Sequence, residues 1–232
     1  IFTSTLTQAE ELGDKRGIGG SLNSIGNVFL AKGDYDKALD YYGRSLAIAE
    51  ELGNKSGMGE MLYNIGNACF NKGDLGKALD YFERSLKICE ELGDKLVMGY
   101  SLKSIGIVHN YKGDYDKAEE YLEKSRALQN EIGLKEIELG TTTSLYLSYK
   151  HLGQDYDVNE IHSLIKEAEN IEFELNFRLY QLLEDTSYLE IAYNGVQEKA
   201  DNLEPDVAAK FLSYPIPKAI VEEWEKVRTV KN

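Results

Sequence analysis

The chain has 232 residues, of which 40 are acidic and 26 are basic, and its formal net charge is −14 at pH 7. A chain this acidic repels phosphate groups, so we expect neither nucleic acid nor an anionic membrane surface among its partners. No apolar run in the sequence approaches the ~20 residues that span a bilayer, and no signal peptide begins it, so we expect a cytoplasmic protein.

One string recurs along the chain at a period of 40 residues. Its first copy begins at Lys32-Gly33-Asp34, and further copies begin at Lys72 and Lys112. Residues 22–55 and 62–95 match at 21 of 34 positions without a gap. A fixed period of this length is the signature of a stacked repeat array, in which each unit packs only on its neighbours.

The first residues already fit this period. Ile1-Phe2 aligns with Tyr41-Tyr42, and residues 10–15 align with residues 50–55. Residues 1–15 are therefore expected to form the second helix of a repeat whose first half is absent. Because the sequence also lacks an initiator Met, we expect it to be a fragment of a longer protein.

Each full repeat predicts two helices. In the first helix Leu22, Ile25, Gly26 and Phe29 are spaced i, i+3, i+4 and i+7, which places them on one face. Glycines at the Gly33 position are expected to end this helix, and the aspartate that follows is expected to cap the second. The glycines at the Gly26 position are expected to let the backbones approach closely, opposite the three alanines Ala38, Ala78 and Ala118. The predicted repeats span residues 16–55, 56–95 and 96–135.

This pattern resembles the tetratricopeptide repeat. Ile25-Gly26, Ala38 and Tyr42 stand where that family has a Leu-Gly pair in one helix and spaced Ala and aromatic residues in the next. Six additional residues, 50–55, lengthen the second helix. The resemblance covers residues 1–135 and implies an all-α fold, a right-handed α-solenoid of antiparallel helix hairpins, with no cofactor.

The rest of the chain departs from the repeat. Residues 136–170 are expected to form a degenerate fourth unit, in which Tyr146 replaces the helix glycine and Val158 stands near the alanine column. Residues 171–232 predict a helical C-terminal cap, with a break at residues 214–217. Residues 211–220 resemble the closing segment of tetratricopeptide arrays in bacterial multidomain signalling proteins, including nucleotide cyclases and kinase–ATPase fusions.

No catalytic or metal-binding pattern is evident. The three histidines, His109, His151 and His162, are scattered, and His109 falls in an apolar column. The glycine-rich residues 17–20 are followed by no Gly-Lys-Ser/Thr, so they do not form a phosphate loop. Cys69 and Cys89 occupy packing columns of the repeat. We therefore expect a protein that is not an enzyme and has no metal site.

Polar residues on the first helix of each repeat lie away from its apolar stripe. The resemblance implies that these helices line the concave surface, where an asparagine amide can both donate to and accept from a peptide backbone. The basic residues of a chaperone-type carboxylate clamp are mostly missing, so we do not expect a ligand held by its C-terminal carboxylate. The net charge of −14 instead predicts a neutral or basic peptide or protein partner. The candidate groove residues are Asn23, Asn27, Leu30, Tyr63, Asn64, Asn67, Phe70, Lys103, Ser104 and Asn110.

Two functions from different classes fit this sequence. The first is a non-catalytic interaction module that binds a peptide or protein segment in the groove. The second is a structural or regulatory arm of a multidomain nucleotide cyclase or kinase–ATPase, which docks on its own catalytic domain. A sensor of a small molecule or signalling peptide is a third reading, and the oligomeric state stays open.

Overall fold

The computed structural model describes residues 2–230, and side chains from residue 5 to residue 229. Every regular element within this range is an α-helix, and thirteen are present. Ile1, the first residue of the expected opening helix, lies outside the described residues. The helices are α1 (Phe2–Leu12), α2 (Lys15–Lys32), α3 (Tyr35–Glu51), α4 (Lys55–Lys72), α5 (Leu75–Leu92), α6 (Lys95–Lys112), α7 (Tyr115–Ile132), α8 (Glu138–Leu152), α9 (Val158–Glu167), α10 (Phe173–Leu183), α11 (Thr186–Asp201), α12 (Pro205–Ser213) and α13 (Pro215–Val230).

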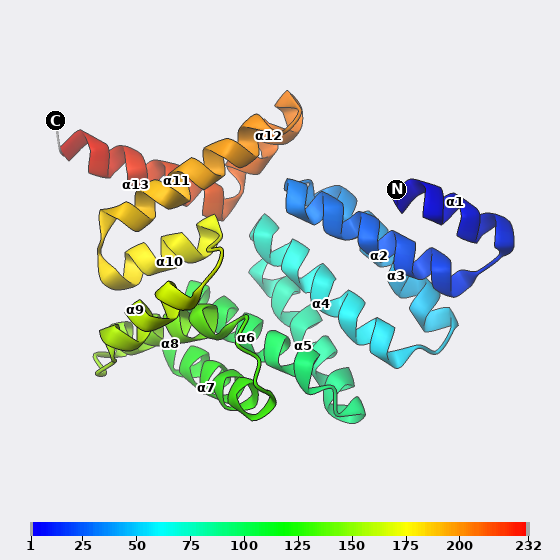
Figure 1. The fold of residues 1–232 in the computed structure, drawn as a ribbon, viewed down its shortest axis with the longest axis horizontal. Helices are drawn as coiled ribbons and strands as arrows, with labels where there is room; N and C mark the ends of the chain where they lie inside the picture. The colour runs from blue at the N-terminus through cyan, green and yellow to red at the C-terminus, as the bar shows by residue number, and fades with distance from the viewer. Residues whose placement is uncertain (1, 231–232) are drawn as a thin grey trace. The chain divides into compact units, whose positions relative to one another are not determined.

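The chain divides into two compact units, Ile1–Ser101 and Leu102–Asn232, with the boundary inside α6. In the first unit α1 packs on α2, α2 on α3, α3 on α4 and α4 on α5 (Figure 1). This is the neighbour-to-neighbour packing that a 40-residue period predicts. None of the described helices combines the length and apolar character required to cross a membrane.

The helix ends follow the repeated Gly-Asp pair. Gly33 and Gly73 adopt left-handed conformations, with φ of 80° and 86°, and end α2 and α4. The Asp34 and Asp74 side chains then cap α3 and α5 by accepting hydrogen bonds from backbone N–H groups three residues later. Asp114 makes no such cap, because its carboxylate lies 3.3 Å from Nδ1 of His109 instead.

The helix glycines face the residue one turn beyond the expected alanine. A Cβ placed on Gly26 would lie 2.5 Å from Cε1 of Tyr42, and one on Gly66 would lie 2.6 Å from Cε1 of Phe82. Both rings are fully buried. The expected Gly–Ala pairing is therefore wrong for these two repeats: the glycine provides room for an aromatic ring of the partner helix, and the ring fills the space between the backbones.

Helices α8 and α9, over the residues expected to form a degenerate fourth unit, pack around Tyr146. This side chain is buried, and its hydroxyl donates to the Glu160 carboxylate on α9. α9 begins five residues after Gly153, whereas α3 begins two residues after Gly33, so the turn before α9 contains an insertion of three residues. Ile161 consequently occupies the alanine column and is fully buried, whereas Val158, the expected occupant, is 38% exposed.

The remaining helices close the second unit. α11 packs on α10, α12 and α13 (Figure 1), and buries Leu189, Ala192 and Val196 completely. The expected break at residues 214–217 ends α12 only. Pro215 begins α13, because proline is tolerated at the first position of a helix, where its missing N–H group would have no partner.

Candidate functional site

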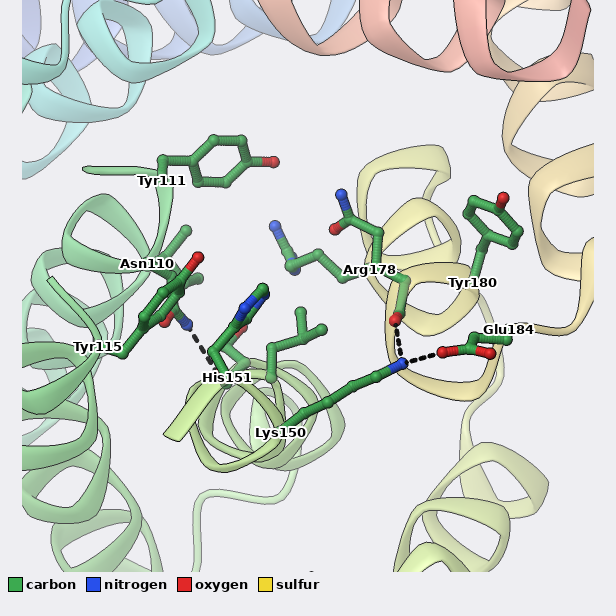
Figure 2. Close-up of a pocket in the computed structure, with 12 residues that line it drawn as sticks. Asn110, Tyr111, Tyr115, Lys150, His151, Arg178, Tyr180 and Glu184 are labelled. Carbon is green, nitrogen blue, oxygen red and sulfur yellow. Dashed lines mark hydrogen bonds and ion pairs between the residues drawn. The ribbon is translucent and has the colours of Figure 1, made fainter. Parts of the chain in front are cut away.

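A cavity of about 460 Å³ lies in the second unit, between α6, the start of α7, α8 and α10 (Figure 2). It is lined by aromatic and polar side chains, whose polar groups converge from four helices. The lining residues are Ile107, Asn110, Tyr111, Tyr115, Ser144, Leu147, Lys150, His151, Arg178, Tyr180, Gln181 and Glu184.

One wall of this pocket consists of two stacked rings. The Tyr115 and His151 rings are nearly parallel, with an interplanar angle of 5° and 4.1 Å between their centroids. Tyr111 lies further along the same side and is 39% exposed (Figure 2). Aromatic faces of this kind provide contact area at a low cost in side-chain entropy, because only two torsion angles become fixed.

Asn110 links α6 to α8 at the base of the pocket. Its Nδ2 donates to the Ser144 carbonyl at 2.7 Å, and its Oδ1 accepts from the Ser148 hydroxyl at 2.8 Å. Both ends of the amide are thus engaged within the protein. Asn110 contributes to the shape of the pocket while its hydrogen-bonding groups hold the two helices together.

Lys150 joins α8 to the end of α10. Its Nζ donates to the carbonyls of Gln181 and Leu182 at 2.9 and 3.1 Å, and to the Glu184 carboxylate at 2.7 Å (Figure 2). A cation is favourable there, because the last carbonyls of a helix carry partial negative charge. Glu184 itself adopts a left-handed conformation with φ of 59°. All three N–H groups of the ammonium therefore have acceptors.

Arg178 differs from Lys150 in its environment. Its side chain extends from α10 into the pocket, toward Tyr111 (Figure 2). The Nε atom is buried and has no hydrogen-bond partner. The rest of the guanidinium hydrogen-bonds the Tyr111 side chain and interacts electrostatically with Glu174.

Lys103 on α6 and Glu174 on α10 also interact electrostatically with Arg178. The pKa of Lys103 is lowered to about 8. Burial is the main cause, and the positive charge of Arg178 is the second. Burial likewise raises the pKa of Glu174, while Arg178 opposes that change. Both shifts have the same cause, because burial disfavours the charged form of each group.

Three asparagines of the predicted groove bind other side chains of the first unit. Asn27 accepts a hydrogen bond from the Tyr42 hydroxyl at 2.7 Å. Asn64 donates to Asn23 at 3.1 Å, and Asn23 donates to the Glu60 carboxylate at 2.8 Å. These bonds connect α2 with α3 and with α4. The amides are therefore used, at least in part, to hold the helices together.

The other predicted groove residues are distributed over both units. Leu30, Asn67 and Phe70 are half-buried on α2 and α4, and Tyr63 packs against the rings of Phe82 and Tyr100. Ser104 is only 7% exposed. Lys103 is half-buried, and Asn110 alone of the ten predicted residues lines the pocket between α6, α8 and α10.

Sequence reasoning missed most of this pocket, although one signal was present. Leu30, Phe70, Asn110 and Lys150 are separated by 40 residues each, so Lys150 continues a column that had been singled out. His151 stands in the next column, after Tyr111. Arg178 has no such signal, because it lies beyond the end of the repeat.

The described residues contain no group of three or more His, Cys, Asp or Glu side chains placed to hold a metal ion. Cys69 and Cys89 are buried free thiols, and burial raises the pKa of both, that of Cys89 to about 11. His109 is 4% exposed and stacks on Tyr121. Each of these three residues is placed as a packing residue of the repeat.

The fold and the pocket are those of a helical-repeat protein. Residues 57–131 match a family model described as tetratricopeptide repeat, and residues 21–56 match a second model with the same description. Residues 21–131 therefore belong to the tetratricopeptide repeat family, which confirms the resemblance derived from the Gly, Ala and aromatic columns.

Solved structures of similar fold cover almost the whole chain. The apo form of RapI is 14% identical, with a TM-score of 0.70 over 97% of this chain and 90% of that chain. Aspartyl phosphate phosphatase F from Bacillus subtilis is also 14% identical, with a TM-score of 0.70 over 98% of this chain and 64% of that one. At such identities the likeness shows the fold alone, and it confirms the all-α solenoid class.

A third structure is a Signal Transduction ATPase with Numerous Domains protein with a tetratricopeptide repeat sensor, from Pyrococcus horikoshii. The two proteins are 17% identical, with a TM-score of 0.59. The match covers 99% of this chain and 33% of that chain. A search of curated proteins found no match.

Proposed function

We propose that this chain is a non-catalytic interaction module that binds a peptide or protein segment, with the pocket lined by residues 107–184 as its anchoring site. The observation that carries the proposal is the position of that pocket. It includes Asn110 and Lys150, which share a repeat column with Leu30 and Phe70. The column predicted to bind a partner thus contributes two residues to this cavity.

The chemistry of the pocket supports a peptide as its ligand. A volume of about 460 Å³ falls within the range of roughly 300–1,000 Å³ that ligand sites occupy. Stacked rings on one side and polar groups on the other suit a segment with both apolar and polar side chains. The chain's net charge of −14 favours a partner that is neutral or basic overall.

We propose a separate contact surface on the first unit, on helices α2 and α4. Leu30, Tyr63 and Phe70 offer apolar contacts there, and Asn67 offers an amide. Asn27 and Asn64 are included as residues that position this surface, since their amides already bind protein groups. The division into three full repeats, a degenerate repeat at 136–170 and a cap at 171–232 is part of the same proposal.

A blocked pocket tests this function. Gln181 is exposed and lines the pocket, so Gln181→Trp should fill part of the cavity without entering the core. Heptapeptides with acetylated N-termini and amidated C-termini, selected from a random library on the wild-type chain, are expected to bind the variant at least about tenfold more weakly.

Asn194→Trp is the matched control, because Asn194 is exposed on α11 and does not line the pocket. It should bind the selected peptides like the wild-type chain. The proposal fails if the library yields no binding peptide, or if both tryptophan variants bind equally well.

A second candidate is a regulatory arm of a larger cytoplasmic signalling protein. It is favoured by the likeness to the ATPase whose title names a tetratricopeptide repeat sensor, because this chain corresponds to one third of that protein. Binding of this chain to a cyclase, kinase or ATPase domain encoded in its own gene would be measured. A complete reading frame without such a domain contradicts this candidate.

A further inference from the structure

A second cavity lies in the first unit, between the start of α2, the end of α3 and the start of α4. Its volume is about 220 Å³, which is below the roughly 300–1,000 Å³ of sites that hold whole small ligands and leaves room for one large side chain. Its lining residues lie between residues 15 and 61, so it shares none with the pocket at residues 107–184. We call it the α2–α4 pocket.

Gly20 keeps one side of the α2–α4 pocket open. It is exposed on α2, and no neighbouring helix lies within 4 Å of a Cβ placed on it. The adjacent Gly19 differs, because a Cβ there would lie 3.4 Å from Cγ2 of Ile48 on α3. The helices α2 and α3 therefore touch at Gly19 and leave an accessible space beside Gly20.

The next repeat places two tyrosines at the corresponding positions. Forty residues further along the chain, Tyr63 stands at the Asn23 position and Tyr100 at the Glu60 position. The two rings pack against each other with their centroids 5.9 Å apart, and Tyr63 also packs on Phe82 at 5.6 Å. Both Asn23 and Glu60 line the α2–α4 pocket, where neither position carries a ring. The space that tyrosine rings fill in the next repeat thus stays open here.

The walls of the α2–α4 pocket suit a ring that carries a hydroxyl group. Ile48 is half-buried and Leu52 is 40% exposed, so both offer accessible apolar surface. The Glu60 carboxylate is exposed at the rim, where its Oε1 accepts from Nδ2 of Asn23 at 2.8 Å. A carboxylate has about four acceptor positions, so Glu60 can accept a further hydrogen bond.

The chain itself uses hydrogen bonds from tyrosine to glutamate to join helices. The Tyr180 hydroxyl on α10 donates to Glu223 on α13 at 3.0 Å, and the Tyr149 hydroxyl on α8 donates to Glu123 on α7. A tyrosine hydroxyl placed at the rim of the α2–α4 pocket would make the same kind of bond with Glu60. A phenylalanine would fill the space without this bond.

We propose that the α2–α4 pocket binds the side chain of a tyrosine on a peptide or protein partner. The ring lies beside Gly20, against Ile48 and Leu52, and its hydroxyl donates to the Glu60 carboxylate. The inference goes beyond the proposed function, because it assigns a second site in the first unit. An uncharged tyrosine also agrees with a partner that is neutral or basic overall.

Selection on the Gln181→Trp variant tests the inference, because the pocket at residues 107–184 is then filled. Heptapeptides with acetylated N-termini and amidated C-termini are selected from the random library on this variant. We expect the selected peptides to share a tyrosine at one position. Changing that tyrosine to alanine should weaken binding at least about tenfold.

Gly20→Trp, added to the Gln181→Trp chain, should fill the α2–α4 pocket without a clash and weaken binding of the selected peptides at least about tenfold. Gly43→Trp in the same chain is the matched control. Gly43 is also an exposed helix glycine with open space around its Cβ, but it does not line the pocket. The control should bind the peptides like the Gln181→Trp chain.

Glu60→Met tests the contact with the hydroxyl group. Changing the peptide tyrosine to phenylalanine should weaken binding about two- to tenfold when Glu60 is present, because one hydrogen bond is lost. The Glu60→Met variant should bind the two peptides equally well. A preference for tyrosine that persists in Glu60→Met contradicts the assigned contact, and so does tighter binding of a phosphotyrosine peptide, because the carboxylate repels phosphate.

Other outcomes overturn the site as a whole. These are selected peptides without a tyrosine, and peptides that bind equally well after Gly20→Trp. A wild-type chain that self-associates and becomes monomeric on Gly20→Trp assigns the pocket to a second copy and overturns the peptide. Equal binding of library peptides to Gln181→Trp and its own control instead overturns the function proposed for the other pocket, so the two failures are distinguishable.

A measurement on the wild-type chain avoids dependence on any variant. The NMR resonance of the Ile48 δ-methyl group should move upfield when a selected tyrosine peptide is added, because nuclei above the face of an aromatic ring are shielded. It should not move upfield with a peptide in which leucine replaces the tyrosine. An unchanged Ile48 resonance at saturation with the tyrosine peptide would contradict the proposal.

Discussion

At the scale of single residues, the helix glycines are explained by the rings they face. We predict that Gly66→Ala lowers the free energy of unfolding by about 1–3 kcal/mol, because the new Cβ would lie 2.6 Å from Cε1 of the fully buried Phe82. This cost exceeds the roughly 1 kcal/mol that alanine gains in helix propensity. Chemical denaturation measures the difference.

Gly43→Ala is the matched control for this substitution. Gly43 lies within α3, is exposed, and has no atom within 4 Å of a Cβ placed on it. The variant should therefore gain up to about 1 kcal/mol from helix propensity. Equal stability of the two alanine variants would show that Phe82 does not restrict the Gly66 position.

Asn27 provides a second residue-scale prediction. Asn27→Ala should lower stability by about 0.5–1.5 kcal/mol, because the Tyr42 hydroxyl loses its 2.7 Å acceptor. In the Tyr42→Phe background the same substitution should cost much less, since no hydroxyl remains to be satisfied. Chemical denaturation measures both effects. If the losses in unfolding free energy from Asn27→Ala and Tyr42→Phe are additive, the two side chains are not coupled, and Asn27 remains a candidate for binding a partner.

At the scale of helices, Lys150 connects α8 to the last turn of α10. Lys150→Met should keep the aliphatic packing of the side chain but leave two α10 carbonyls without their donor. We expect a loss of about 1–3 kcal/mol in unfolding free energy, with faster amide exchange at the end of α10. Lys87→Met serves as the control, because Lys87 is exposed on α5.

Amide exchange rates in α10 that are unchanged in the Lys150→Met variant would contradict this prediction. They would mean that the hydrogen bonds to Gln181 and Leu182 do not stabilise the end of α10. The outcome also matters for the pocket, because Lys150 and Glu184 both line it. A loosened α10 would shift Arg178, which lies on the same helix.

At the scale of the whole molecule, burial is unevenly distributed along the chain. Ten consecutive residues of α8, 139–148, are buried, whereas the described side chains of α1 are mostly exposed. We predict that backbone amides of α8 exchange with solvent more slowly than those of α1 by several orders of magnitude, because exchange in α8 requires the surrounding helices to open. Hydrogen exchange followed by mass spectrometry measures this.

A uniform exchange rate over α1 and α8 would contradict the prediction and indicate that the chain opens in one step. The expected gradient follows from the architecture, since a repeat in an array is supported only by its neighbours and an outer helix has a neighbour on one side. The net charge of −14 does not change which helix exchanges faster, because amide exchange reports local opening of each helix.

The sequence alone determined the repeats and the ends of their helices. The Gly-Asp pair recurs every 40 residues, and glycine at that position is needed because the left-handed conformation is costly for other residues. Apolar spacing within α2 and α4 likewise identified buried residues such as Leu22 and Leu62. These features depend on residues close in sequence, so local pattern was sufficient.

Only the tertiary structure decided which residues fill the spaces between helices and which form the pocket. Tyr42 rather than Ala38 faces Gly26, because a long ring reaches across the gap from the next turn. The insertion before α9 moved Ile161, not Val158, into the alanine column. Arg178 lies some 70 residues from Asn110 in sequence, outside the period, and the packing of α10 on α8 brings it into the same pocket.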